Sequence, residues 1–559
     1  MGRISRVVFL FVLAIGIGAA PRQQSVRIIV QGGSLEAASA AVTARGGVVL
    51  GSFASISALV AEVPAGSVAG LEAAGLRVTP DRMVETSGER ERIDAELEVI
   101  SGETYPADTT GAAALHAQGL TGKGVTVAVI DSGMPALNAN WQRVDATTLR
   151  FQKIIDGRPW FIVYKDFVSQ LRITQSSDPY GHGTHVLATI ADGRAAPSGS
   201  AIGIAPDANL LMVRALDETG QAPYSRIIQA IDWVIANKQL YNIKVLNLSL
   251  QAPIHGPYWH DPLAQAVMAA WAEGITVVAA AGNAGPAPAT ITVPGNVPYV
   301  ITVGAVKPGV YTGSGVDELA YYSSAGPTES KFVKPDVVIA GSRVVAPMPI
   351  ASALEPQAGK LTDKAKVDMS GLKSRDELGY YLLSGTSMAA AEVSGMVALL
   401  LQDEPALSNN QIKYRLINTA EIATDGAGQA AYSIWQQGGG RVNPQAMIAA
   451  ATTQSANAGM DIALDRDHES GTHYMGNTAY DEATYGFYFA GQPVNIGSYQ
   501  SWAGSYQSWA GSYQSWAGSY QSWAGSYQSW AGSYQSWAGS TSVWSTSYQS
   551  WAGNLVADE

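Results

Sequence analysis

The sequence predicts an α/β fold in which a mostly parallel sheet lies between layers of helices. The first observation is a set of short, nearly continuous apolar runs with the length of buried strands, at residues 125–130, 210–213, 245–250 and 275–280. The second is that apolar residues recur with a helical period in two segments, 225–238 and 262–273, which lie between the last three runs. Apolar strands that alternate with helices are typical of a parallel sheet covered on both faces.

The composition of the 559-residue chain excludes several classes of protein. Lys and Arg number 34 against 46 Asp and Glu, a net charge of −12, so we expect no nucleic-acid partner. Hydrophobic residues make up 47%, which argues against a disordered chain. Cysteine is absent, which excludes disulfides, a Cys nucleophile and thiolate metal sites.

The chain begins with the residue order of a secretory signal peptide. Arg3 and Arg6 precede the apolar run 7–17, and small residues follow at 18–20. A run of this length is short of the roughly 20 residues that span a bilayer, and no later segment is both long and apolar enough. We therefore expect residues 1–20 to be a signal peptide and the mature protein to be secreted, extracellular or attached to the cell surface, with no transmembrane segment.

Residues 25–80 predict a small α+β module in the order strand, helix, strand, strand, helix, strand. The expected strands are 26–30, 47–50, 58–63 and 76–78, and the expected helices are 35–45 and 66–74. The order is typical of a ferredoxin-like module, and its place between a signal and a larger domain suggests a propeptide, which we assign to 21–82. The polar, charged residues that follow predict an exposed, cleavable linker and maturation region at 83–110.

Three polar residues of the larger domain, which we assign to 111–454, stand at strand ends and helix starts. Asp131 directly follows the strand 125–130 and is expected at the carboxyl edge of the sheet, where α/β proteins bind ligands. Taken alone it is more often a turn former or a helix cap. His182 lies between two glycines at the start of an apolar helix. Alone it could be a structural histidine or, with His185, part of a metal pair that lacks a third ligand.

Ser387 lies in the third of these segments, 385–390, which leads into a very apolar helix at 393–401. A helix cap is the commoner role for such a serine, but a nucleophile gains from an N–H group at the positive end of the helix dipole. Serine is inert without a base, and the base needs an acid that fixes its tautomer. Asp131, His182 and Ser387 supply these three types.

Four blocks of sequence then point to one family. They are 127–133 around Asp131, 181–186 around His182, 279–285 around Asn283 and 385–390 around Ser387. In this order they resemble the signature blocks of the subtilisin-like serine peptidases. The resemblance extends over about 340 residues. It implies a subtilisin-like three-layer fold, preceded by the small propeptide module.

The resemblance also implies the roles of the site residues. Ser387 attacks the scissile carbonyl, His182 acts as base and then as acid, and Asp131 orients the imidazole. Asn283, which without the other blocks reads as a turn residue beside Gly282, would bind the oxyanion together with the Ser387 N–H group. The remaining substrate-binding residues would be Ser249, Leu250 and Gln251 on a strand that pairs with substrate, and Ala280, Ala281 and Gly282 on the facing pocket wall.

Three features depart from the family pattern. Ala391 stands where proline is usual, which changes the helix entry but removes no catalytic group. Gln251 replaces a glycine of the substrate-pairing segment and is expected to narrow the pocket. The charged stretch 360–377 predicts a solvated insertion.

No cofactor is expected for the chemistry, whereas a structural calcium ion is compatible with the family. Candidate oxygen ligands are Asp156, Asp166 and Asp178, although surface carboxylates are the better interpretation.

After a linker at 455–496, the tail 497–553 repeats the heptapeptide Gly-Ser-Tyr-Gln-Ser-Trp-Ala. Its Gly and Ser content disfavours a coiled coil, and its odd period disfavours a simple strand. We expect a low-complexity segment whose aromatic rings stack on polysaccharide or on each other, or a passive tail.

The sequence as a whole predicts a secreted serine endopeptidase matured by removal of its propeptide, with protein or peptide substrates. The alternative from another class is a surface-adhesion or glycan-binding protein that works through its Trp repeat, with a secondary or inactive peptidase domain. A narrow processing protease or a transpeptidase shares the triad and stays open at this stage.

Overall fold

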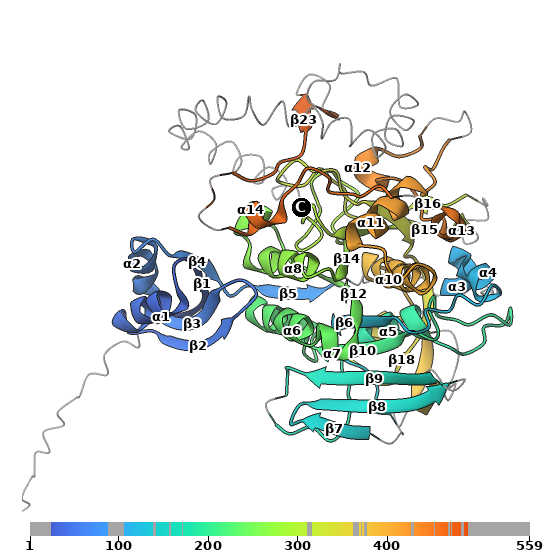
Figure 1. The fold of residues 1–559 in the computed structure, drawn as a ribbon, viewed down its shortest axis with the longest axis horizontal. Helices are drawn as coiled ribbons and strands as arrows, with labels where there is room; N and C mark the ends of the chain where they lie inside the picture. The colour runs from blue at the N-terminus through green and yellow to red at the C-terminus, as the bar shows by residue number, and fades with distance from the viewer. Residues whose placement is uncertain are drawn as a thin grey trace, which may run out of the picture. The chain divides into compact units, whose positions relative to one another are not determined.

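The structure is a computed structural model, and its described residues are 24–87, 105–137, 141–155, 158–169, 171–309, 316–360, 368–369, 372–373, 377–425, 430–451, 453–467, 470, 472–481 and 486–489. The chain divides into two compact units, Met1–Phe53 with Ser57–Asp81 and Ala54–Ile56 with Arg82–Glu559. The expected signal peptide and the heptapeptide repeat lie outside the described residues (Figure 1).

The first unit is a four-stranded antiparallel sheet, with strands in the order β2-β3-β1-β4 and two α-helices. The predicted order of elements is confirmed: β1 (Ser25–Gln31), α1 (Leu35–Ala44), β2 (Val48–Phe53), β3 (Ala58–Pro64), the 3-10 turn η1 (Ala65–Ser67), α2 (Val68–Glu72) and β4 (Arg77–Pro80). Ser34 begins α1 as its N-cap, because its Oγ accepts the Ala37 N–H group at 3.1 Å.

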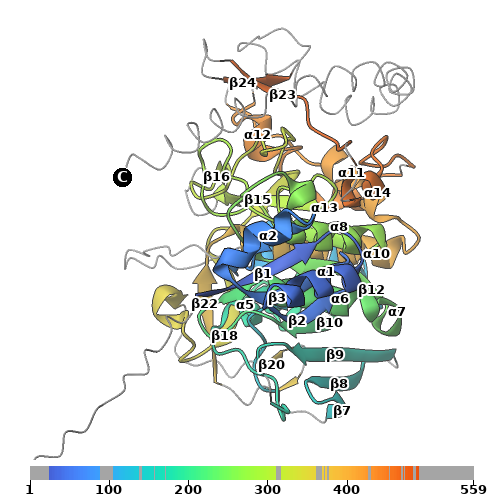
Figure 2. The ribbon, with the colours of Figure 1, turned by 90° about the vertical axis from the view of Figure 1, so that its left-hand side faces the viewer.

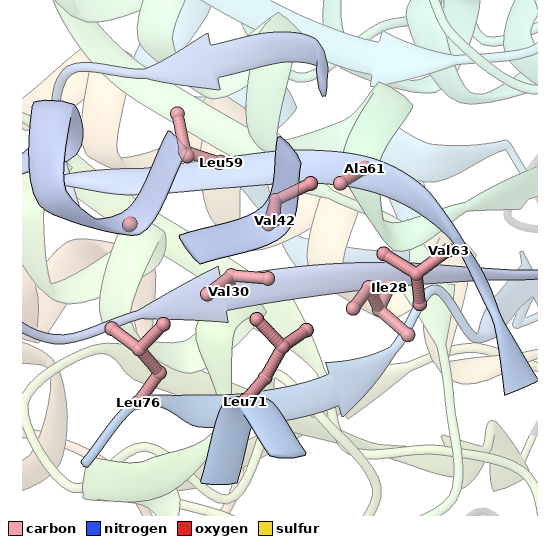
Figure 3. Packing of buried hydrophobic residues seen from close by; sticks show 9 residues of the cluster. Ile28, Val30, Val42, Leu59, Ala61, Val63, Leu71 and Leu76 are labelled. Atoms are coloured by element: carbon pink, nitrogen blue, oxygen red, sulfur yellow. The ribbon is translucent and has the colours of Figure 1, made fainter. Parts of the chain in front are cut away.

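Apolar side chains from the helices and the sheet of this unit form its core (Figure 3). Val42 of α1 and Leu71 of α2 are fully buried with Val30 of β1 and Ala61 of β3. Each fully buried side chain of the size of Val or Leu contributes about 1.5–3 kcal/mol. The unit therefore has its own hydrophobic core.

The second unit is built on a ten-stranded sheet with the order β16-β15-β14-β12-β6-β10-β9-β8-β7, in which β17 also pairs with β15. β15, β14, β12, β6, β10 and β9 run parallel to one another, and β17 is parallel to β15. The pairs β15-β16, β9-β8 and β8-β7 are antiparallel. The bounds are β6 (Thr126–Asp131), β7 (Trp141–Asp145), β8 (Thr148–Ile155), β9 (Arg158–Asp166), β10 (Asn209–Arg214), β12 (Ile243–Leu248), β14 (Thr276–Ala280), β15 (Ile301–Lys307), β16 (Glu318–Leu319) and β17 (Val337–Ala340).

Helices cover both faces of this sheet, so the predicted three-layer α/β arrangement is confirmed. Figure 1 shows α6 and α8 on one side and α5 and α10 on the other, and Figure 2 shows β9, β8 and β7 side by side at one edge of the sheet. The helices of the unit are α3 (Pro106–Thr110), α4 (Ala112–His116), α5 (His182–Ala191), α6 (Tyr224–Ala236), α7 (Lys238–Tyr241), α8 (Pro262–Ala272), α10 (Thr386–Asp403), α11 (Asn409–Asn418), α12 (Ile434–Gln437), α13 (Pro444–Ala449) and α14 (Ile462–Arg466), with 3-10 turns η3 (Tyr258–His260) and η4 (Glu355–Gln357).

Smaller sheets complete the unit. One of them has the order β11-β5-β13 and another the order β18-β22-β19, and two further pairs are β20-β21 and β23-β24. Their strands are β5 (Met83–Thr86), β11 (Gln221–Pro223), β13 (Leu250–Gln251), β18 (Val344–Pro349), β19 (Gly359–Lys360), β20 (Asp368–Met369), β21 (Leu372–Lys373), β22 (Leu378–Leu383), β23 (Thr478–Asp481) and β24 (Gly486–Phe489). Most of the expected insertion at 360–377 lies outside the described residues.

The structure differs from the sequence prediction just after the first unit. Residues 83–87 were expected in an exposed linker, but Met83–Thr86 is the strand β5, paired on both sides. Val84 and Ser87 are fully buried, whereas Glu85 is exposed. Thr86 is buried as well, but the segment contains only one buried apolar side chain, Val84, and is too short to be predicted as a strand. Among the described helices, none is long and apolar enough to cross a membrane.

Candidate active site

Asp131 is the last residue of β6, a central strand of the sheet, and its side chain is fully buried. The strand is parallel to β10 on one side and to β12 on the other. Six successive residues of β6 are buried because helices cover both faces of the sheet. The carboxylate therefore lies at the carboxyl edge of the sheet, as the sequence predicts.

His182 is the first residue of α5, and its imidazole faces the Asp131 carboxylate. Its Nδ1 lies 2.8 Å from Oδ1 and 3.0 Å from Oδ2 of Asp131. Because a carboxylate only accepts hydrogen bonds, this contact places a proton on Nδ1 and leaves Nε2 to act as a base. Among the described residues, Nε2 has no hydrogen-bond partner.

Glycines on both sides of His182 allow this close approach. Gly181 has a φ of 102°, which favours glycine. A Cβ added to Gly183 would lie 2.4 Å from the carbonyl oxygen of Gly133, just after the Asp131 strand. The strand end and the helix start are thus in backbone contact.

Asp178 joins these two segments through a buried network, which corrects its interpretation as a surface carboxylate. Its side chain is buried, and Oδ1 accepts the Ser132 hydroxyl and the Gly181 N–H group, both at 2.8 Å. Oδ2 accepts the Thr184 N–H group at 2.8 Å and the Thr184 hydroxyl at 2.6 Å. Burial raises the pKa of Asp178, and these donors act against that rise. The carboxylate therefore holds the residues next to both Asp131 and His182.

Ser387 lies in the first turn of α10 and is fully buried. Its Oγ donates to the carbonyl oxygen of Ser249 at 3.2 Å. Its N–H group points along the positive end of the helix dipole and lies 3.4 Å from the carbonyl oxygen of Ser87. Ala391, the unusual residue noted in the sequence, lies buried inside the same uninterrupted helix.

Asn283 directs its amide NH₂ group at the same carbonyl oxygen of Ser87. Its Oδ1 accepts the Thr386 N–H group at 3.0 Å and the Thr386 hydroxyl at 2.9 Å. Since a backbone N–H can only donate, this contact fixes which end of the amide is oxygen. The opposite end, Nδ2, donates to Ser87 at 2.6 Å. Two donors therefore converge on one carbonyl oxygen, which is the geometry of an oxyanion hole.

The chain's own segment around Ser87 is held as a strand in front of these residues. β5 pairs antiparallel with β13, Thr86 opposite Leu250 and Glu85 opposite Gln251, and antiparallel with β11 on its other edge. The Ser87 N–H group also donates to the Ser249 carbonyl oxygen at 3.3 Å. The segment thus lies as an extended strand between β13 and β11.

The predicted substrate-binding residues fall into two groups. Ser249, Leu250 and Gln251 line one edge of β5. Ala280, Ala281 and Gly282 are buried at the end of β14 and lead into Asn283. The backbone groups of Ala281 and Gly282 bond Val303, Thr292, Ser324 and Thr386. The pocket-wall role of this second group stays a prediction.

No metal site is assembled by the candidate ligands. Among the residues that the structure describes, no group of three or more His, Asp or Glu side chains is arranged to hold an ion. His185 uses Nε2 to bond the carbonyl oxygens of Val344 and Tyr381, and burial lowers its pKa to about 3.

The carboxylates named as calcium candidates do not fit that role where they are described. Asp166 is buried and not on the surface as expected; it accepts the N–H groups of Val168 and Ser169 and pairs with Arg214 at 3.2 Å. Both oxygens of Asp178 accept the hydrogen bonds described above. Asp156 lies outside the described residues. A structural calcium ion at another position stays a prediction.

Comparison with known sequences identifies the family. The sequence model of the subtilase family matches residues 122–463. The chain belongs to the subtilase family. Serine protease AprX of Bacillus subtilis is 35% identical over 312 residues, 54% of this chain and 62% of that protein. Subtilisin of Bacillus pumilus is 32% identical over 322 residues, 56% of this chain and 90% of that protein.

Coverage of other relatives is partial. The chain also spans 65% of the length of subtilisin E of Bacillus subtilis, at 32% identity. Among solved structures, this subtilase resembles fervidolysin of Fervidobacterium pennivorans, described as a keratinolytic enzyme related to subtilisin, with a TM-score of 0.54 and 20% identity over 77% of this chain and 62% of that one. At this identity the likeness supports the fold. The family resemblance seen in the four sequence blocks is confirmed.

Three residues that shape the site were missed from the sequence. Thr386 orients Asn283, Asp178 fixes the turn before His182, and the Ser87 carbonyl oxygen accepts the Asn283 amide NH₂ group. Asp178 could have been suspected, because an aspartate four residues before the histidine of a Gly-rich turn is well placed to accept its N–H groups. The pairing that positions Ser87 leaves no comparable local signal.

Proposed function

We propose that this subtilase is a secreted serine endopeptidase, made as a precursor that cuts its own Ser87–Gly88 bond. Residues 24–81 would then be the core of the propeptide. The observation that carries the proposal is the Ser87 carbonyl oxygen, which accepts hydrogen bonds from Asn283 Nδ2 at 2.6 Å and the Ser387 N–H group at 3.4 Å. A carbonyl polarised by two donors beside a serine is the group that an acyl-transfer site attacks.

The reaction follows from the groups that face this carbonyl. Ser387 Oγ adds to the carbonyl carbon of Ser87 while His182 Nε2 takes the hydroxyl proton. The negative charge that develops on the Ser87 oxygen is stabilised by Asn283 and the Ser387 N–H group. The C–N bond to Gly88 then breaks, and His182 returns the proton to the leaving amine. Water attacks the acyl-enzyme by the same route and restores the Ser387 hydroxyl.

Asp131 supports both proton transfers without giving up a proton. Its two oxygens face His182 Nδ1, which leaves Nε2 to take the serine proton and stabilises the imidazolium that forms. The Ser387 hydroxyl is bonded to the Ser249 carbonyl oxygen at 3.2 Å, so a rotation about its Cα–Cβ bond must precede attack. Staggered side-chain rotamers exchange easily compared with the chemical step.

Replacement of the nucleophile tests this proposal. Ser387→Ala, expressed in a host without extracellular proteases, should accumulate uncut at Ser87–Gly88, whereas wild-type protein should begin at Gly88. Intact-mass measurement and N-terminal sequencing report the cut, and a fluorophosphonate probe should label Ser387 in the wild type.

The matched control is Ser408→Ala, which removes an exposed helix-cap hydroxyl and should process normally. Normal maturation of Ser387→Ala would contradict self-cleavage. An unlabelled Ser387 in a folded, processed chain would contradict the peptidase itself.

The remaining interpretations stay predictions. Export rests on the order of residues 1–20, and attachment to polysaccharide through the repeat 497–553 rests on its aromatic content. Both segments lie outside the described residues. No contact in the described part of the chain favours the adhesion function over peptide hydrolysis.

A further inference from the structure

Gln251 replaces a glycine of the family pattern, and its side chain connects two parts of the site. It lies on β13, directly opposite Glu85 of β5. Its Oε1 accepts the Asn283 N–H group at 3.0 Å, and its Nε2 donates to Glu85 Oε1 at 3.2 Å. One amide therefore contacts both the oxyanion-hole residue and the bound strand.

The orientation of this amide is fixed from the protein side. The Asn283 backbone N–H can only donate, so the Gln251 carbonyl oxygen must face it. The NH₂ group must then face the strand, and it can only donate. Among the described residues, Gln251 is the one side chain that hydrogen-bonds the Glu85 carboxylate.

Glu85 is the third residue on the amino side of the proposed cut, counting Ser87 as the first. We propose that Gln251 makes this enzyme selective at that third position for side chains that accept hydrogen bonds, glutamate above all, over cationic ones. The inference rests on the proposed function, because it treats β5 as a bound substrate. Glutamate supplies a charged acceptor, glutamine a neutral one, and lysine only donors that repel the amide NH₂ group.

The same amide positions the oxyanion hole. It holds the Asn283 backbone, while Thr386 holds the Asn283 side chain. Loss of Gln251 should therefore affect both turnover and selectivity. Gln251→Glu separates the two effects: one carboxylate oxygen can still accept the Asn283 N–H group, while the other presents negative charge to the third position.

The test uses the enzyme that is obtained when the full-length chain is expressed and matures. The substrates are fluorogenic peptides Val-Xaa-Thr-Ser-coumarylamide, in which Xaa is Glu, Gln, Ala or Lys. A parallel series carries Leu in place of the terminal Ser, so that the result does not depend on one leaving residue. We expect wild-type kcat/KM to fall in the order Glu, Gln, Ala, Lys, with Glu preferred over Lys by roughly fivefold to tenfold, because the contact lies at an exposed rim.

Gln251→Glu should reverse this order and favour Lys. Gln221→Glu is the matched control, because Gln221 pairs with Glu85 from the other strand and the change adds the same charge. It should shift the preference much less than Gln251→Glu does.

Equal hydrolysis of all four peptides by the wild type would overturn the inference, and this comparison needs no variant to fold. An unchanged order in Gln251→Glu, or an equal shift in Gln221→Glu, would overturn it too. Hydrolysis of none of the peptides would instead refute the proposed function, and this inference with it.

Discussion

The buried Asp178 network predicts that a single oxygen-to-nitrogen change will impair catalysis without altering the proposed triad of Asp131, His182 and Ser387. The Asp178 carboxylate accepts four hydrogen bonds, from Ser132, from Gly181 and two from Thr184. Gly181 and Thr184 flank His182, and Ser132 follows Asp131. Asp178→Asn keeps the size of the side chain but leaves one acceptor oxygen where two are used.

The magnitude follows from the donors. In one amide orientation the NH₂ group faces the Thr184 N–H group, and in the other it faces the Gly181 N–H group. Either way a buried backbone donor loses its acceptor, which costs about 1–3 kcal/mol, while the neutral amide avoids the cost of burying a charge. We expect a net loss on the order of 1–2 kcal/mol of unfolding free energy.

The catalytic effect should appear in kcat. A shift of the turn that carries His182 misplaces Nε2 relative to the reacting serine, and misplacement on the order of 1 Å can cost about 10²-fold. We expect a decrease in kcat of roughly 10- to 100-fold for Asp178→Asn, with KM within about threefold of wild type, because the strand-pairing residues are not touched.

Steady-state kinetics on fluorogenic peptides measures kcat and KM, and denaturant unfolding in a Ser387→Ala background measures stability without self-digestion. Asp261→Asn is the matched control: Asp261 is buried and accepts the N–H groups of Leu263 and Ala264, and none of its described hydrogen bonds involves a triad residue. One amide oxygen can still accept both N–H groups, so this variant should keep kcat and change stability little. Wild-type kcat in Asp178→Asn, or an equal loss of kcat in both variants, would show that the Asp178 network does not position His182.

Two further predictions concern the oxyanion hole and a buried acid. Asn283→Ala should lower kcat by about 10²–10³ with little change in KM, a magnitude known for the equivalent donor of subtilisin; a kcat within threefold of wild type would count against it. Burial raises the pKa of Glu329 to about 7 from an ordinary value of 4.5. The fold therefore favours the protonated form, so stability should fall as pH rises from about 4.5 to about 7. Glu329→Gln, which does not titrate, should gain up to about 3 kcal/mol over wild type between pH 5 and pH 8 in denaturant unfolding, and an equal difference at both pH values would contradict this.

The central part of the fold was predictable because both faces of its strands are buried. β6, β10 and β14 are buried at every position, and each read as an apolar run in the sequence. β8 and β9 were missed because charged residues interrupt their apolar ones, as in Arg150, Lys153 and Lys165. An antiparallel hairpin at a sheet edge shows neither the continuous run of a central strand nor a helical period.

The strand that precedes Ser87 could not be predicted from the sequence for a different reason. β5 is four residues long, and its pairing partners β11 and β13 lie more than 130 positions further along the chain. Its polar composition indicates an exposed linker when read locally. Only the pairing with two distant strands buries Val84 and Ser87, so the site of the proposed cut is a tertiary property.

The two amides of the site show what a single sequence leaves open even where the residue type is predicted. The side-chain amides of Asn283 and Gln251 each have an oxygen that accepts hydrogen bonds and an NH₂ group that donates them. Which of the two groups faces the bound strand depends on the hydrogen bond that the other group makes. The Asn283 side-chain oxygen accepts the N–H group of Thr386, which is 103 positions away. The Gln251 side-chain oxygen accepts the N–H group of Asn283, which is 32 positions away. Each amide is thereby left as a donor toward the bound strand. The chemistry of the site therefore resides in these pairs, because neither residue alone determines the group that it presents.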